Sequence, residues 1–257
     1  MIIIDAQVNI SGRDQKTAEV LRALRQHDID TAVIFADAES VDLESSNRYV
    51  LRSGQEFDCY PFYYLGGNPF TDTRMDLEDP PNLEDYAGVR WHGWFAESED
   101  RTGRVDRHEL DFAVVTMESP EFGGLMSGLQ FYGKPIIFEE DFAVTLEFVR
   151  RYEALTVIIP HLGMLSGGEE KVVGELHRYP NVYFTTSHAA LEPAMVRRIG
   201  PERLLFASDY PRGKLGPSIE KIKRLDLSDE DEALVFGENL ERILNQEIEE
   251  PDDPDDE

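Results

Sequence analysis

Eight short apolar segments, separated by stretches with helical spacing, constrain the fold of this chain more than any other feature. They lie at residues 2–8, 31–36, 60–66, 87–92, 135–139, 155–160, 182–186 and 203–208. Apolar runs of this length are typical of strands that are covered on both faces, as in parallel sheets. Eight such strands alternating with helices, with no central break, favour one closed (β/α)₈ TIM barrel over an open doubly wound sheet.

The segments between the strands have the spacing and the boundaries of helices. Residues 17–24 place apolar side chains at helical spacing. Residues 169–179 end at Pro180, which stops helices because it has no backbone N–H to donate. Two polar stretches, 67–86 and 93–107, predict long loops, which in a barrel would lie near the catalytic face.

The end of the chain differs in composition from the rest. Residues 247–257 carry eight acidic residues and two prolines. Such a segment cannot bury enough apolar surface to fold. We therefore expect a single barrel domain over residues 1–246 and a disordered acidic tail over residues 247–257.

The chain is strongly acidic, with 52 Asp and Glu residues against 25 Lys and Arg residues and a net charge of −27. Such a field repels nucleic acids and anionic lipid surfaces. No apolar run approaches the roughly 20 residues of a membrane helix, and the N-terminus lacks the basic region of a signal peptide. The sequence therefore predicts a cytoplasmic protein with no nucleic-acid or membrane partner, and it leaves a homo-oligomer open.

Polar side chains follow several predicted strands, at the edge where a barrel carries its chemistry. Gln7 and Asn9 are spaced i, i+2 at the end of the first segment, so their side chains point the same way. Asp209, in Ala-Ser-Asp-Tyr-Pro, ends the eighth segment, and His161, in Pro-His-Leu-Gly, follows the sixth. We interpret Asp209 and His161 as catalytic acid–base groups. The alternatives are a turn or cap aspartate and a core histidine bonded to a backbone carbonyl.

Charged residues also mark the fourth and fifth strands. Glu139 ends Pro-Ile-Ile-Phe-Glu, where its carboxylate can bind a hard cation, and the alternative is an acidic helix start. Arg90 and His92 share one side of the fourth strand, and Arg90 can clamp a substrate carboxylate with two hydrogen bonds. The alternative for Arg90 is an ion pair with Glu139 or Asp209, whose charge would also replace that of a missing metal.

Further polar residues lie beside these along the chain. Ser187 and His188 end the seventh strand, and Arg212 follows Asp209 and can meet an anion. The residues that we assign to substrate binding are therefore Gln7, Asn9, Arg90, His92, Ser187, His188 and Arg212.

Together these motifs resemble the amidohydrolase-related family (amidohydrolase family 2) of metal-dependent TIM-barrel hydrolases and decarboxylases. The resemblance covers residues 1–246 and rests on the Ile-Asp opening, Gly67-Asn68-Pro69, the segments around His161 and Asp209, and the closing segment 237–244. It implies an amidohydrolase-like barrel in which Asp209 ligates a metal and helps to move a proton of the attacking water. It also implies that His161 lies beside the metal as a general base or a substrate-polarising group.

Three positions depart from the pattern of that family. Gln7 and Asn9 occupy the places of its His-x-His, and Glu139 occupies the place of a further metal-binding histidine. Amides are poor zinc ligands, so a site built on Asp209 and Glu139 would hold Mg²⁺, Mn²⁺ or Ca²⁺ weakly in preference to stoichiometric Zn²⁺, or no metal. The two amides can instead bond a polar ligand directly or fill a lost metal site with internal hydrogen bonds.

Two classes of function follow. The first, which we favour, is an amidohydrolase-like hydrolase or decarboxylase that acts on a small carboxylate-bearing metabolite with an altered or absent metal site. In this enzyme His161 and Asp209 are the acid–base pair and Arg90 holds the substrate. The second is a catalytically silent barrel with a binding or assembly role.

The charge balance also predicts adaptation to salt, because arginine outnumbers lysine by 19 to 6 within the acid excess. The Debye length falls to about 3 Å at 1 M salt, so salt relieves the repulsion among acidic residues. Thermal unfolding should therefore shift to markedly higher temperature between roughly 0.1 M and 2 M KCl, measured by scanning calorimetry. A flat or falling Tm would favour an ordinary acidic mesophilic protein.

Overall fold

The structure is a computed structural model that describes residues 1–11, 14–37, 42–66, 77, 82–95 and 107–245. The strands are β1 (Ile4–Ile10), β2 (Thr31–Ala36), β3 (Tyr60–Gly66), β4 (Gly88–His92), β5 (Ile136–Glu139), β6 (Val157–Ile159), β7 (Val182–Thr185) and β8 (Leu204–Leu205). The α-helices are α1 (Asp14–Gln26), α2 (Leu43–Phe57), α3 (Arg107–Met117), α4 (Pro120–Phe131), α5 (Phe142–Arg151), α6 (Glu169–Leu176), α7 (Pro193–Ile199), α8 (Leu215–Lys223), α9 (Asp229–Ala233) and α10 (Asn239–Leu244). Shorter helical segments are η1 (Pro160–Ser166), η2 (Pro201–Arg203) and η3 (Leu234–Glu238).

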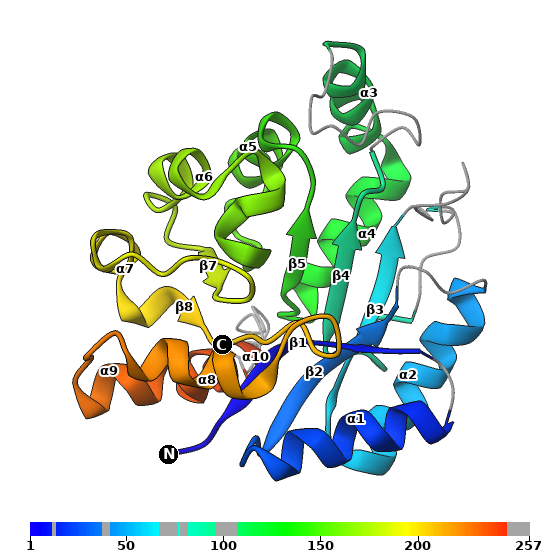
Figure 1. The fold of residues 1–257 in the computed structure, drawn as a ribbon. Helices are drawn as coiled ribbons and strands as arrows, with labels where there is room; N and C mark the ends of the chain where they lie inside the picture. Colours follow the sequence, from blue (N-terminus) through cyan, green and yellow to red (C-terminus); the bar gives the residue numbers. More distant parts are fainter. Residues whose placement is uncertain (12–13, 38–41, 67–76, 78–81, 96–106, 246–257) are drawn as a thin grey trace, which may run out of the picture.

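The predicted (β/α)₈ barrel is confirmed. The eight strands pair in chain order and every pair is parallel, with helices on the outside of the strands (Figure 1). Within the described ranges, no helix combines the length and apolar character that crossing a membrane requires. The predicted tail, 247–257, and most of the two predicted long loops lie outside the described residues.

The barrel closes through the segment that follows β8. The backbone N–H of Ala6 in β1 donates to the carbonyl of Phe206 at 2.9 Å. The fully buried Asp5 carboxylate accepts the backbone N–H of Ser208 at 3.0 Å and its hydroxyl at 2.5 Å. Backbone and side chain together therefore hold the first strand against the end of the last.

Alternation along β4 separates the core from the cavity of the barrel. The indole of Trp91 packs on the rings of Phe122 in α4 and Phe138 in β5, with centroid distances of 5.3 and 5.9 Å. Arg90 and His92 line the cavity. Because successive strand residues face opposite sides, one short strand supplies both an aromatic core and two polar side chains of the cavity.

The buried Asp5 carboxyl group, which helps to close the barrel, predicts that the free energy of unfolding depends on pH. Burial raises the pKa of Asp5 from 3.8 to about 7, despite the hydrogen bonds that it accepts from Ser208 and Gln7. Between these two values the folded state keeps a proton that the unfolded state has lost, so stability falls as the pH rises through this window. Asp5→Asn cannot titrate and should lose this component, roughly 3 kcal/mol between pH 5 and 8.

Urea unfolding of the wild type and Asp5→Asn at pH 5 and pH 8 measures this difference. The comparison within each protein cancels any constant cost of the substitution. Equal pH dependence of the two unfolding free energies would contradict the assignment of a buried, proton-binding Asp5.

Candidate functional site

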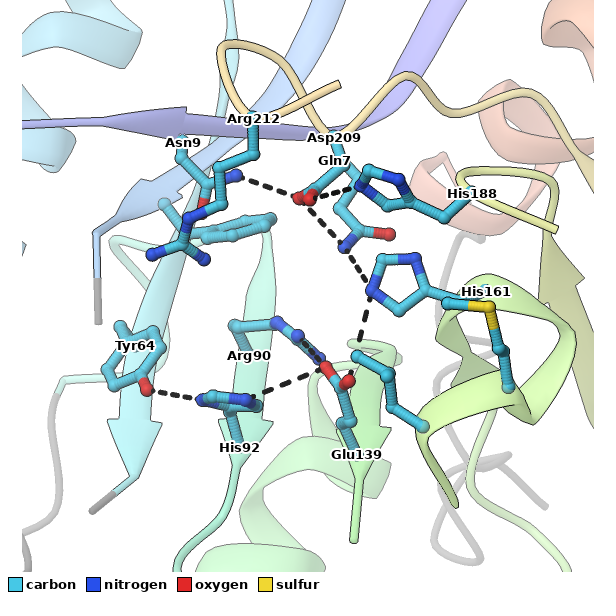
Figure 2. A pocket seen from close by; sticks show the side chains of 13 residues that line it. Gln7, Asn9, Tyr64, Arg90, His92, Glu139, His161, His188, Asp209 and Arg212 are labelled. Carbon is cyan, nitrogen blue, oxygen red and sulfur yellow. Dashed lines mark hydrogen bonds and ion pairs between the residues drawn. The ribbon is translucent and has the colours of Figure 1, made fainter. Parts of the chain in front are cut away.

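A cavity of about 350 Å³ opens where the strands end (Figure 2). This volume is within the range of small-molecule sites. The residues that line it are Gln7, Asn9, Phe35, Tyr64, Arg90, His92, Glu139, His161, Met164, Leu165, His188, Asp209 and Arg212. The structure thus brings together every site residue predicted from the sequence except Ser187, which is fully buried and hydrogen-bonds His161.

Three of these residues take a left-handed backbone at the strand ends. The φ angles are 55° at His161, 54° at His188 and 57° at Asp209, and each such conformation costs an L-residue about 1–2 kcal/mol. The turn after His161 continues to Gly163 at φ 80°, where a Cβ would approach the Val172 side chain to 2.3 Å. Because strain of this kind concentrates at functional positions, it supports a functional reading of all three.

Asp209 is held by three N–H donors. Its Oδ1 accepts from Asn9 Nδ2 at 2.9 Å and from Gln7 Nε2 at 3.2 Å, and its Oδ2 lies 2.8 Å from His188 Nε2. Only 6% of the residue is exposed. The amides of Gln7 and Asn9, which were predicted to point to the same side of β1, therefore both bond the Asp209 carboxylate near the other end of the chain.

His161 lies between this group and the charged residues on β4 and β5. Its Nε2 is 3.3 Å from Gln7 Nε2 and 3.8 Å from Glu139 Oε1, and its Nδ1 is 2.8 Å from Ser187 Oγ. Burial lowers the pKa of His161, so the ring is held neutral. A line of interactions therefore crosses the cavity from Asp209 through Gln7 and His161 to Glu139 (Figure 2).

Arg90 and Glu139 form a buried ion pair at the far end of that line. Burial by itself would raise the pKa of Glu139, but the charge and the hydrogen bond of Arg90, together with His92 and His161, outweigh burial and lower the pKa to about 2. The structure therefore selects the ion pair with Glu139 from the two pairings that the sequence left open for Arg90.

Arg90 still has hydrogen-bonding capacity that nothing in the described part of the chain uses. Its Nη1 is buried without a hydrogen-bond partner among those residues, while its guanidinium carbon lies 5.5 Å from the ring centroid of Phe35. A buried N–H without a partner is costly, which marks this atom as a place for a ligand acceptor.

His92 completes this side of the cavity as a neutral group. Its Nδ1 is 2.8 Å from the hydroxyl of Tyr64, and its Nε2 is 3.9 Å from Glu139 Oε2. Burial lowers the pKa of His92 to about 4, although Glu139 opposes the shift. His92 is therefore a neutral polar contact for a ligand at neutral pH.

Sequence reasoning missed the apolar part of the cavity. Met164 and Leu165 follow His161 in η1 and are 38% and 62% exposed, and Phe35 and Tyr64 come from β2 and β3. The available signal was the apolar pair Met164-Leu165 directly after the Pro-His-Leu-Gly motif, together with aromatic residues near two strand ends. The cavity therefore has a polar floor and an apolar wall.

The donor set around the cavity does not fit a divalent metal. Among the described residues, no group of three or more His, Cys, Asp or Glu side chains could hold one. Glu139 is neutralised by Arg90, and Asp209 accepts N–H groups from two amides. A hard cation needs six or more oxygen ligands and zinc prefers imidazole or thiolate, so we derive no catalytic step through a metal.

The same donor set predicts the metal content of the purified protein. Within the described part of the chain, the carboxylates that line the cavity are those of Glu139 and Asp209, and both are already paired. The protein should therefore hold no stoichiometric Zn²⁺, and any Mg²⁺, Mn²⁺ or Ca²⁺ should leave during dialysis against chelator. Elemental analysis before and after dialysis measures both. One tightly held Zn²⁺ per chain would show that these side chains rearrange around a metal.

Comparisons with known proteins are consistent with this barrel. A family model described as "Amidohydrolase" matches residues 129–246. No curated protein matches the chain.

Three solved structures with similar folds each match 95% of this chain. Amidohydrolase 2 from Bifidobacterium longum subsp. infantis is 15% identical, with a TM-score of 0.63 over 99% of that chain. 5-Carboxyvanillate decarboxylase from Sphingomonas paucimobilis is 12% identical, with a TM-score of 0.62 over 98% of that chain. A probable 2-pyrone-4,6-dicarboxylic acid hydrolase from Acinetobacter baumannii, with citric acid bound, is 12% identical, with a TM-score of 0.65 over 99% of that chain. The second half of the chain is therefore similar in sequence to amidohydrolases, and the whole barrel has an amidohydrolase-like (β/α)₈ fold.

Proposed function

We propose that this protein is a hydrolase or decarboxylase that acts on a small carboxylate-bearing metabolite, with acid–base groups at His161 and Asp209 and with an altered or absent metal site. One observation carries the proposal. A single cavity holds a buried neutral imidazole, a buried carboxylate and a buried guanidinium that retains an unused donor among the described residues.

Arg90 is the group that would recognise the substrate carboxylate. Its Nη2 bonds Glu139, and its Nη1 is the atom without a partner in the described residues. A carboxylate on Nη1 would gain a charge-assisted hydrogen bond from a guanidinium that is largely buried. The neutral His92 beside it adds no competing charge.

The apolar wall favours a ligand with a ring or other apolar body. Met164, Leu165 and Phe35 would contact such a body while the carboxylate meets Arg90. Two of the similar structures carry the names of enzymes for carboxylated ring compounds, a 5-carboxyvanillate decarboxylase and a probable 2-pyrone-4,6-dicarboxylic acid hydrolase. Their names and this wall support a carboxylated cyclic substrate.

The two acid–base groups suit either reaction. In hydrolysis, His161 would take a proton from water as the water oxygen bonds the carbonyl carbon, and would return that proton to the leaving oxygen or nitrogen. In decarboxylation, His161 that has first taken a proton from water at Nε2 would give that proton to the substrate carbon as the bond to the carboxylate breaks and CO₂ leaves, and the imidazole would become neutral again. Asp209 would hold His188 and stabilise positive charge near the reacting atoms.

We also propose that Gln7 and Asn9 stand where amidohydrolases carry His-x-His. Their amide N–H groups give Asp209 the positive partners that a metal would otherwise give it. Arg90 does the same for Glu139. The site would then keep the carboxylate of Asp209, carry Glu139 in the place of a histidine, and replace the cation with fixed dipoles and one guanidinium.

Turnover of a panel of aromatic carboxylates, dicarboxylates and lactones tests the proposal. His161→Asn and Asp209→Asn should each lower kcat at least about 100-fold for any substrate found, because the first removes the proton-transfer group and the second removes the carboxylate that stabilises positive charge beside it. Circular dichroism spectra and Tm values serve as the control that each variant is folded. A wild type that binds these compounds but turns over none would favour a silent barrel with a binding role.

Ligand-binding measurements test the role of Arg90 separately from turnover. Arg90→Lys keeps the charge beside Glu139 but loses the planar fork, so calorimetry should show benzoate binding weakened about tenfold or more while benzamide binding is unchanged. Arg151→Lys makes the same change in an ion pair with Glu147 outside the cavity and serves as the matched control. Equal weakening of benzoate and benzamide would reject carboxylate recognition by Arg90.

A further inference from the structure

The hydrogen bonds around His161 specify which of its ring nitrogens carries the proton. Asp209 Oδ1 already acts as an acceptor, because it accepts an N–H of the Asn9 amide at 2.9 Å. The amide of Gln7 must therefore turn its Nε2 toward Asp209 Oδ1, 3.2 Å away. The other end of the same amide agrees, because Gln7 Oε1 accepts the hydroxyls of Thr185 and Ser187, each at 3.1 Å.

This amide orientation determines the state of the imidazole. Gln7 Nε2 also lies 3.3 Å from His161 Nε2, and an amide NH₂ group has no lone pair to offer there. His161 Nε2 must therefore accept, so it carries no proton. A neutral imidazole then has its proton on Nδ1, which faces Ser187 Oγ at 2.8 Å.

Ser187 completes a closed cycle of hydrogen bonds with Gln7 and His161. Its one hydroxyl proton goes to Gln7 Oε1, which leaves its oxygen lone pairs to accept from His161 Nδ1–H. Thr185 supports the same arrangement, since its hydroxyl donates to Gln7 Oε1 and accepts the backbone N–H of His161 at 3.0 Å. Each hydrogen bond made by the Gln7 amide or by the His161 ring then has one consistent direction.

Burial makes that direction hard to reverse. Ser187 and Thr185 are 0% exposed, Gln7 is 1% exposed and His161 is 4% exposed. Reversing the tautomer would place two N–H donors against each other at the Gln7 contact, and it would leave Gln7 Oε1 and His161 Nδ1 to compete for the one hydroxyl proton of Ser187. Among buried groups each such conflict is costly.

We propose that Gln7 and Ser187 are positioning residues that hold neutral His161 with its proton on Nδ1, so that the Nε2 lone pair faces the cavity as the base of the site. The inference rests on the proposed function only in naming His161 the base. A proton arriving at Nε2 would displace one Gln7 N–H, and the resulting imidazolium would lie 3.8 Å from Glu139 Oε1. Gln7 would keep its other N–H on Asp209.

The tautomer can be measured directly by NMR of protein labelled with ¹⁵N-histidine, because long-range ¹⁵N–¹H correlations distinguish a protonated from an unprotonated ring nitrogen. The chain has six histidines, and His161→Asn identifies the signals of His161. At pH 8 we expect wild-type His161 to be neutral with its proton on Nδ1. A wild-type proton on Nε2 would overturn the proposal without any variant.

Two variants test the positioning residues themselves. Ser187→Ala removes the acceptor for Nδ1–H, and Gln7→Met removes the donor to Nε2 with little change in shape. Each should raise the ratio of the Nε2–H to the Nδ1–H tautomer about tenfold, since each removes one buried hydrogen bond. Thr186→Val is the matched control, because its buried hydroxyl bonds Ala207 N and does not touch the His161 ring.

The outcomes separate this inference from the proposed function. An unchanged ratio in folded Ser187→Ala and Gln7→Met would overturn the positioning role, even if the enzyme turns over a substrate. The expected tautomer and its shift in both variants would support that role, even if no substrate in the panel reacts. If a variant does not fold by circular dichroism, the wild-type spectrum still decides the tautomer.

Discussion

The closure of β1 on the segment after β8 is the constraint on which the site depends. It brings Gln7 and Asn9 against Asp209, about 200 positions later in the chain. The buried bonds between Asp5 and Ser208 hold that closure one layer below the cavity. Without it, the Asp209 carboxylate would lose the two amide donors that face it.

Charge balance inside the cavity is local. Glu139 is paired with Arg90, and Asp209 is surrounded by N–H donors from β1 and by His188. Each carboxylate is thus compensated by protein groups within hydrogen-bond distance, which is how a protein keeps buried charge without a metal. Among the described residues that line the cavity, Arg90 Nη1 is a buried donor without a hydrogen-bond partner, which suits an external acceptor.

Two neutral histidines lie among the charged groups of the cavity and have different roles. Burial lowers the pKa of His161 and of His92, so both are neutral beside an ionised Glu139. Their roles differ because their partners differ. His161 is oriented by Gln7 and Ser187, whereas His92 bonds the hydroxyl of Tyr64.

The eight strands, the parallel barrel and most of the polar residues that line the cavity could be predicted from the sequence, because apolar runs and i, i+2 spacing are local properties of the chain. Helices α3 and α4 were not predicted. In both helices the apolar residues are not confined to one face, so the helical periodicity of the sequence is weak there. Only the tertiary structure decided that Arg90 pairs with Glu139, that His188 bonds Asp209 and that Ser187 lies behind His161. These pairings join different strands, so they depend on barrel register and closure, which no local pattern encodes.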